Sequence, residues 1–273
     1  ALRSAALEDQ DNTAVGGRLR YEQDLDKGLT AFAGISRSVR QPDATERYVL
    51  KASPTGIAWV GNPSLDPETH HQIDFGLSGQ YSAMKLQWDA VLFYDNVSDF
   101  VLRDTNRGAI AGVSPTATIY RNVDATLWGG ELSGQWMFTQ GWMAYGSLAY
   151  VQAENTTDDR NIAQIPPLNG RVGLEYMQSD WSAGGRVRFA AKQDRIDTLS
   201  GLDTIETPGY GVVDLYGSYN ITQTTVLKAG IDNLFDELYA EHVNRAYAGI
   251  FGNPQDRIYE PGISLWARID TTF

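Results

Sequence analysis

Three histidines are the residues of this chain best suited to ligate a transition metal. His70 and His71 are adjacent, and His242 directly follows Glu241 in a polar stretch near the C-terminus. Imidazole ligates copper, zinc and iron, and carboxylate oxygens also bind metal ions. Adjacent residues of a strand point to opposite faces, so His70 and His71 cannot easily hold one ion. We treat these four residues as candidate ligands, with hydrated or packed loop contacts as the plainer alternative.

Other metal chemistry is less favoured by the residue types. The absence of Cys removes disulfides, thiolate nucleophiles and Cys-ligated zinc. Methionine thioethers suit Cu(I), but Met84 and Met177 fall in or beside short turns, and no Met falls in a long loop. The acidic loop residues lack the converging spacing of a calcium site, so we expect them to be solvated. They are Asp158, Asp159, Asp194, Asp197, Asp203 and Glu206.

An enzymatic function needs a nucleophile, a base and an orienting group that converge. Two of the three His are adjacent, and no Ser has the glycine context of a nucleophile elbow. We therefore expect that the protein is not an enzyme.

Charge and hydropathy exclude further classes. The net charge of -12 over 273 residues argues against nucleic acid and against a polybasic membrane-surface binder. No run of about 18 apolar residues encodes a membrane helix. The chain opens in polar sequence without a signal peptide, so we expect either a soluble protein or a longer chain whose start is missing.

The elements that must position these residues are strands of about ten residues with a period of two. About eleven are expected, with a break at Gly129-Gly130. Their ranges are Gly17–Asp24, Leu29–Arg37, His71–Tyr81, Leu86–Val97, Tyr120–Phe138, Trp142–Glu154, Arg171–Met177, Trp181–Ala191, Gly211–Ile221, Thr225–Asp232 and Ile263–Phe273.

The connections alternate between short turns and long polar loops. The long loops are Ser38–Thr69, Asp104–Thr118, Asn155–Pro167, Lys192–Pro208 and Asn233–Gly262. Tight turns at one end and long loops at the other are typical of transmembrane β-barrels. A soluble β-sandwich or β-helix also alternates, but the strand length and the aromatic residues near the ends of the apolar faces favour the membrane.

Several segments resemble the TonB-dependent outer-membrane receptors in order and spacing. They are Ser36 to Asp43 with Glu46 and Arg47, Gly61 to Glu68, Tyr120 to Val123 with Gly129 to Leu132, Asn233 to Asp236, Tyr239, Pro261 with Gly262, and Phe273. Each motif alone has low specificity, but together they cover nearly the whole chain. Pro42 to Tyr48 and Tyr239 to Asn244 look most like the copper-receptor branch, and iron-siderophore receptors share most of the scaffold.

The resemblance implies an all-β fold, an antiparallel up-and-down transmembrane β-barrel of about 22 strands around an N-terminal plug. Residues 1–273 would be the C-terminal portion, about half of that barrel, with the plug domain absent. An open half-barrel leaves unpaired strand edges in lipid, where each unsatisfied backbone group costs several kcal/mol. An independent barrel with an odd number of strands is the alternative, which bacterial single-chain barrels avoid.

The function implied is active, TonB-energised uptake of a metal or metal chelate, copper or a ferric siderophore, across the outer membrane of a Gram-negative bacterium. The metal is cargo, and no resident cofactor is expected. The implied partners are outer-membrane lipid, the TonB complex through the missing plug, and the barrel-assembly machinery through the terminal Phe273. A passive outer-membrane pore or a surface-binding, adhesive β-protein is the alternative.

The charged residues of the polar face have an expected role within this fold. Arg186 and Arg188 share one face with each other and, across the neighbouring strand, with Arg171 and Glu175. We expect a lumenal ion-pair ladder that holds a plug, with ligand contact as the alternative. Arg268 and Asp270 of the last strand are expected to point into the same lumen.

Overall fold

A computed structural model of the chain describes residues 13–26, 28–53, 56–203, 205–244 and 257–272. These residues form one 14-stranded sheet with the strand order β1-β2-β5-β6-β7-β8-β10-β11-β12-β13-β14, and β3, β4 and β9 lie off this path. Each neighbouring pair along the path is antiparallel. The predicted all-β meander is therefore confirmed.

All eleven long strands were predicted, and apart from β6 their bounds lie within three residues of the predicted ones. They are β1 (Gly17–Asp26), β2 (Leu29–Arg40), β5 (Glu68–Tyr81), β6 (Leu86–Thr105), β7 (Thr118–Thr139), β8 (Trp142–Asn155), β10 (Asn169–Met177), β11 (Trp181–Ala190), β12 (Tyr210–Asn220), β13 (Thr225–Asp232) and β14 (Ser264–Thr271).

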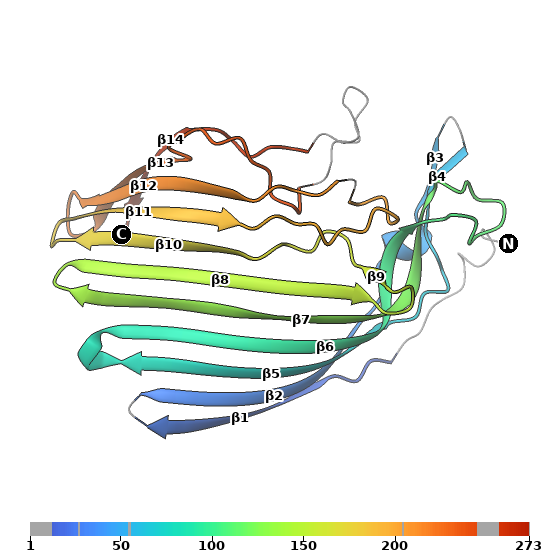
Figure 1. Ribbon diagram of the computed structural model, residues 1–273, viewed down its shortest axis with the longest axis horizontal. Coiled ribbons are helices and arrows are strands. Elements are labelled where there is room, and N and C mark those ends of the chain that lie inside the picture. The colour runs from blue at the N-terminus through green and yellow to red at the C-terminus, as the bar shows by residue number, and fades with distance from the viewer. Residues whose placement is uncertain (1–12, 27, 54–55, 204, 245–256, 273) are drawn as a thin grey trace.

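The two ends of the sheet differ (Figure 1). One end carries tight turns, including the 3-10 turn η1 (Ser82–Met84). The other carries the long connections and the small elements α2 (Ala44–Tyr48), β3 (Leu50–Ser53), β4 (Gly56–Val60) and β9 (Arg160–Asn161). We call these the turn end and the loop end. Among the described residues, no helix is long and apolar enough to cross a membrane.

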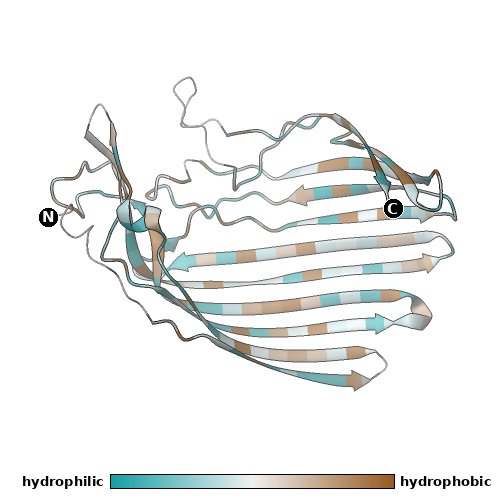
Figure 2. Ribbon diagram, turned by 180° about the vertical axis from the view of Figure 1, so that it is seen from behind, coloured by the Kyte–Doolittle hydropathy of each residue, from teal (hydrophilic) through white to brown (hydrophobic). Residues whose placement is uncertain are grey.

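Side chains alternate between an apolar and a polar face, visible as hydropathy stripes along the strands in Figure 2. The strand register places apolar residues of neighbouring strands opposite each other on the same face. Phe75 lies opposite Leu92, and Leu215 lies opposite Ile231. Large apolar side chains on this face are exposed, with Leu92 at 66% and Leu265 at 79%. An apolar surface of this extent does not suit water, so the face needs an apolar environment.

The buried core lies at the loop end instead of at mid-sheet. Its first cluster packs Val97, Ala125, Ala153 and Ile162. A second joins Leu65, Val101 and Tyr120. β6 and β7 supply many of these residues. β6 continues to Thr105, past its predicted end at Val97, and pairs there with the first residues of β7. The long loops thus pack on an extended strand pair.

The break expected at Gly129-Gly130 is wrong. β7 pairs without interruption from Ala125 to Trp136 with β8, and Gly129 and Gly130 lie opposite Phe93 and Leu92 of β6. A side chain at Gly129 would collide with the Tyr150 carbonyl and press on the Phe93 ring. These glycines therefore make room for large neighbours within a continuous strand.

The sheet is not closed, and β1 and β14 are the two ends of the strand order. β14 returns to the turn end, where the Thr272 amide donates to the Thr224 carbonyl at 2.9 Å. Along β14 the apolar Leu265 and Ile269 lie opposite Ile231 and Leu227, as predicted for the outward face.

Candidate functional site

The polar face contains a carboxylate shared by two arginines. Asp214 of β12 accepts from Arg186 Nε at 2.7 Å and from Arg188 Nε at 2.8 Å, both on β11. Its other oxygen accepts from the Asn233 amide at 3.0 Å. Asp214 has no exposed surface, whereas each arginine side chain is about a third exposed. The pair of arginines is thus fixed in place while part of each remains available to a ligand or a neighbouring segment.

The structure contains only part of the predicted ion-pair ladder: the residues share a face, but Glu175 is not the partner of the arginines. Arg171 lies opposite Arg188, and Glu175 lies opposite Gly184, so all the predicted residues share the polar face. The carboxylate that binds both arginines, however, is Asp214. Sequence reasoning missed this role, although the period of two along Gly211–Ile221 puts Asp214 on the face opposite to Leu215.

A cavity of about 460 Å³ lies on the polar face beside this pair, toward the turn end. Glu175, Arg186 and Trp266 line it together with Tyr145 and Tyr216. The two tyrosine hydroxyls are 2.6 Å apart and join β8 to β12 across the intervening strands. Hydroxyl, carboxylate and guanidinium groups therefore all line this cavity.

The last strand adds charges to the same face. Asp270 accepts from Arg268 and from Lys228, whose Nζ lies 3.0 Å away on β13. Lys228 lies opposite Arg268 in the register of the two strands. These charges are consistent with a wet polar face at its C-terminal edge.

The adjacent histidines point to opposite faces, as predicted. His70 Nδ1 lies 2.7 Å from Asp95, and its Nε2 lies 3.6 Å from Glu68. His71 is exposed on the apolar face, in register with Asn96. The pair therefore does not converge on one ion.

His242 and Glu241 lie in the last long loop and also diverge. His242 is buried, with Nδ1 at 2.8 Å from the Thr207 hydroxyl and Nε2 at 3.5 Å from Asp203. Glu241 accepts from the Tyr210 hydroxyl. Within the described ranges, no three His, Asp or Glu side chains are grouped to hold a metal ion. Phe273 lies outside the described residues.

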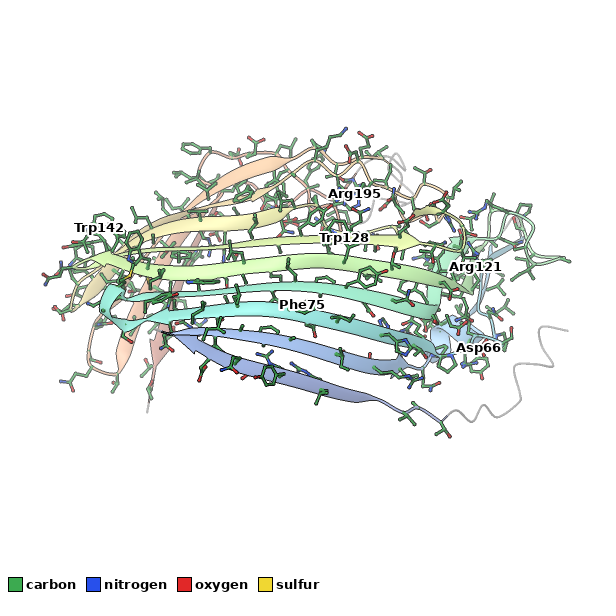
Figure 3. The ribbon with its side chains drawn as sticks, turned by 60° about the horizontal axis from the view of Figure 1, so that its bottom comes forward. Asp66, Phe75, Arg121, Trp128, Trp142 and Arg195 are labelled. Atoms are coloured by element: carbon green, nitrogen blue, oxygen red, sulfur yellow. The ribbon has the colours of Figure 1, made fainter. Side chains whose placement is uncertain are left out.

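A second charged cluster ties the loops together around Asp104, at the loop-side end of β6. Asp104 is fully buried and accepts from Arg107 at 3.0 Å, Arg121 at 2.9 Å and Arg160 at 2.6 Å. Arg160 also reaches Asp197 at 2.6 Å. One carboxylate thereby connects loops that are far apart in sequence (Figure 3, where Arg121 marks the loop end).

The pKa values in this cluster follow from its hydrogen bonds. Burial raises the pKa of Asp104, but donors from the Thr105 amide, Arg107 and Arg121 outweigh it and hold the pKa below its ordinary value. The hydrogen bond from Arg121 lowers the pKa of Asp158 to about 2. Both carboxylates are therefore charged at neutral pH.

The expectation that the acidic loop residues are solvated is wrong for Asp197 and Asp203. Both are buried, at 3% and 1% exposure. Asp197 pairs with Arg160, and Asp203 accepts from the backbone amides of Gln164 and Asp197. These loops fold against each other, so their carboxylates bind protein donors instead of water.

Comparison with known proteins bears on what this arrangement does. The β-barrel of the "TonB dependent receptor-like" family matches residues 7–234. The solved structure of the copper transporter OprC is 38% identical with a TM-score of 0.85, over 96% of this chain and 40% of that one. The iron-regulated outer membrane virulence protein of Vibrio cholerae is 25% identical over 98% of this chain and 43% of its own length.

A third relative broadens the range of cargo among similar proteins. The hemin receptor of Yersinia pestis is 27% identical over 77% of this chain and 32% of its own length. The chain thus spans less than half the length of the curated relatives it matches.

Proposed function

Because the chain belongs to the TonB-dependent receptor β-barrel family, we propose that it is the C-terminal wall of an outer-membrane receptor that takes up a metal ion or metal chelate. The observation that carries this proposal is the 38% identity to a copper transporter over 96% of the chain. Copper is accordingly the first candidate cargo. A ferric chelate or hemin is the second, since the hemin receptor is also similar.

The predicted family, fold and outer-membrane location of a Gram-negative bacterium are confirmed. The family consists of transport receptors, and we propose that this protein performs no catalytic step and holds no resident cofactor. The metal enters only as cargo.

We propose that residues 1–273 pair through β1 and β14 with further strands of one larger barrel. The sheet described is open, and free backbone groups at two edges would cost several kcal/mol each in lipid. A plug domain within that barrel would contact the polar face and the TonB complex. The barrel-assembly machinery would engage the C-terminal strand.

In this proposal the residues of the polar face hold the plug and shape the path of the cargo. Asp214 fixes Arg186 and Arg188, and Arg171, Glu175, Arg268 and Asp270 extend the charged surface. At the loop end, His70, His242 and Glu241 are candidates for transient contact with cargo, and His71 is the weakest candidate because it faces outward. The cluster around Asp104 would hold the loops in a fixed arrangement for capture.

Uptake in a strain that lacks the gene tests this proposal. Radiolabelled copper and ferric-siderophore uptake are measured in the deletion strain, with the full-length gene restored, and with the TonB complex removed. We expect copper uptake to fall on deletion and to return only when both gene and TonB are present. Unchanged copper uptake would refute copper as cargo, and TonB-independent restoration would point to a passive pore.

A further inference from the structure

A row of exposed polar side chains crosses three strands where the apolar face meets the loop end. Arg37 of β2 lies opposite His71 of β5, which lies opposite Asn96 of β6. All three are exposed. The next row toward the turn end is apolar and consists of Leu19, Ile35, Ile73 and Tyr94.

Two open hollows lie on this face, and we call them together the groove. The upper part has a volume of about 640 Å³ and is lined by Arg37, His71 and Asn96 above Ile73 and Tyr94. The lower part has a volume of about 650 Å³ and an almost wholly apolar lining, which begins at Phe75, two residues along β5 from Ile73. Phe75, Leu92, Trp128 and Gly130 line the lower part (Figure 3 labels Phe75 and Trp128).

Gly130 lies at the floor of the lower groove, where the Leu92 side chain packs over it. It lies opposite Leu92 on one side and Tyr150 on the other, both large side chains. A Cβ at this position would fall 2.6 Å from Leu92 Cδ2. Gly130 therefore gives the Leu92 side chain room to lie flat on the strand, and both residues line the lower groove.

The charge at the head of the groove is unusual for this face. Among the described outward positions of β1, β2, β5 and the Leu86–Asn96 part of β6, Arg37 is the one Lys or Arg. An arginine on a lipid-facing strand costs about 2–4 kcal/mol at the bilayer midplane but about 0–1 kcal/mol near the interface. Arg37 is thus suited to headgroup depth, where guanidinium groups bind phosphate in charge-assisted hydrogen bonds.

We propose that this groove binds a phosphate-bearing lipid of the outer leaflet. The phosphate meets Arg37, His71 and Asn96, and one acyl chain runs down past Ile73, Phe75 and Leu92 to Gly130. From Arg37 to Ala31 is a rise of about 20 Å along the strand, or about 14 Å in depth for a strand tilted by about 45°. That depth matches one leaflet, about half of a 30 Å hydrocarbon core. The proposal uses only the membrane location of the chain and is independent of its cargo.

Lipid retention by the full-length protein tests the proposal. The protein is purified from outer membranes in detergent, and bound lipid is measured by native mass spectrometry. Wild type is expected to retain a phosphate-bearing lipid, and Arg37→Glu or Arg37→Gln to hold it about tenfold more weakly, because the charged hydrogen bonds are lost. Arg20→Ala, on the polar face of the adjacent strand, is the matched control and should retain the lipid.

Rebinding identifies the chemistry that is recognised. Delipidated protein is titrated with lipid A, phosphatidylglycerol or uncharged diacylglycerol, after heat-modifiable migration has shown that each variant is folded. Tighter binding of either phosphate lipid than of diacylglycerol, lost in both Arg37 variants, supports the proposal. Equal binding of all three lipids, wild-type retention by the Arg37 variants, or a second copy of the chain covering the groove would overturn it.

Discussion

Asp104 shows how one buried carboxylate can organise several loops. Three guanidinium groups donate to it, from Arg107, Arg121 and Arg160. A buried carboxylate is stable only when paired and hydrogen-bonded, so each arginine offsets the cost of burying the charge. Because Arg160 also binds Asp197, displacing any one of these loops would leave a buried charge short of partners.

The loops are expected to loosen in acid at a defined pH. The hydrogen bond from Arg121 lowers the pKa of Asp158 from 3.8 to about 2. A depressed folded-state pKa contributes stability above the unfolded value of 3.8, and that contribution is lost as pH falls toward 2. Hydrogen exchange in residues 156–168 should therefore accelerate between these values. Arg121→Gln should exchange rapidly even at pH 5, and wild-type-like protection in that variant would contradict the assignment.

Asp214 is expected to matter more for stability than other carboxylates of the polar face. Asp214→Ala leaves Arg186 and Arg188 without their shared acceptor, and we expect a loss of about 2 kcal/mol, since both arginines are partly exposed. Asp232→Ala is the matched control, because Asp232 is 3.7 Å from Arg186 and more exposed. Its expected cost is below about 1 kcal/mol. Urea unfolding in detergent measures both, and equal losses would contradict the role given to Asp214.

At the level of elements, the segments that resemble the receptor family are held together by hydrogen bonds and ion pairs. Arg40 donates to Glu46 and Glu68, and Arg47 donates to the Pro63 carbonyl at 2.7 Å. Asp43 and Glu46 form a capping box at the start of α2. Two motifs separated in sequence thus fold onto each other at the base of one loop.

The motif formed by Asn233 to Asp236 and Pro261-Gly262 is also held together by hydrogen bonds between segments separated in sequence. Asn233 has a positive φ of 53° and binds the Glu237 backbone through its side chain. Asp236 accepts from the Ile263 amide at 2.9 Å, where the chain re-enters the sheet. The corner and the Pro261-Gly262 segment are therefore two sides of one loop closure.

Two Gly→Ala substitutions in strands can separate the steric cost of a new Cβ from the effect of the substitution on the backbone. Gly129→Ala should destabilise the barrel by about 1–3 kcal/mol, because the new Cβ collides with the Tyr150 carbonyl and meets the Phe93 ring. Gly211→Ala is the matched control, since no atom lies within 4 Å of its Cβ position. Thermal unfolding monitored by heat-modifiable migration compares them. Equal melting of the two variants would show that Gly129 is not a packing position.

The strands were predictable and the loops were not, for physical reasons. Alternation is a local signal, and it located β13 to the residue. The extension of β6, the β3–β4 hairpin and the pairing of Asp104 with Arg160 depend on contacts between distant segments. From the sequence alone, Asp197 is expected to be a solvated loop residue, because its partner Arg160 lies in another loop.

At the scale of the whole molecule, the two open edges are the main feature to explain. β1 and β14 end the strand order, and each exposes a row of backbone groups. In the larger barrel that we propose, the polar face that carries Asp214, Arg186 and Glu175 would be one wall of the lumen. The period of two along the strands predicted which residues share this face. It did not predict which carboxylate forms an ion pair with each arginine.

The C-terminal strand should matter for assembly. Deletion of Phe273 or Phe273→Ala in the full-length protein is expected to reduce insertion several-fold, since the terminal aromatic resembles an assembly signal. The heat-modifiable fraction in isolated outer membranes measures this. Thr272→Ala serves as the control, and normal insertion without Phe273 would contradict the prediction.

The account depends most directly on which face meets lipid. The chain has no Cys, so single cysteines can carry spin labels along β6 and β12 in the full-length reconstituted protein. We predict that labels at Leu92 and Leu215 are more accessible to oxygen than to a water-soluble nickel chelate, and that labels at Asp89 and Ser218 show the reverse preference. An accessibility profile without a period of two, or with these faces exchanged, would contradict a membrane-spanning wall.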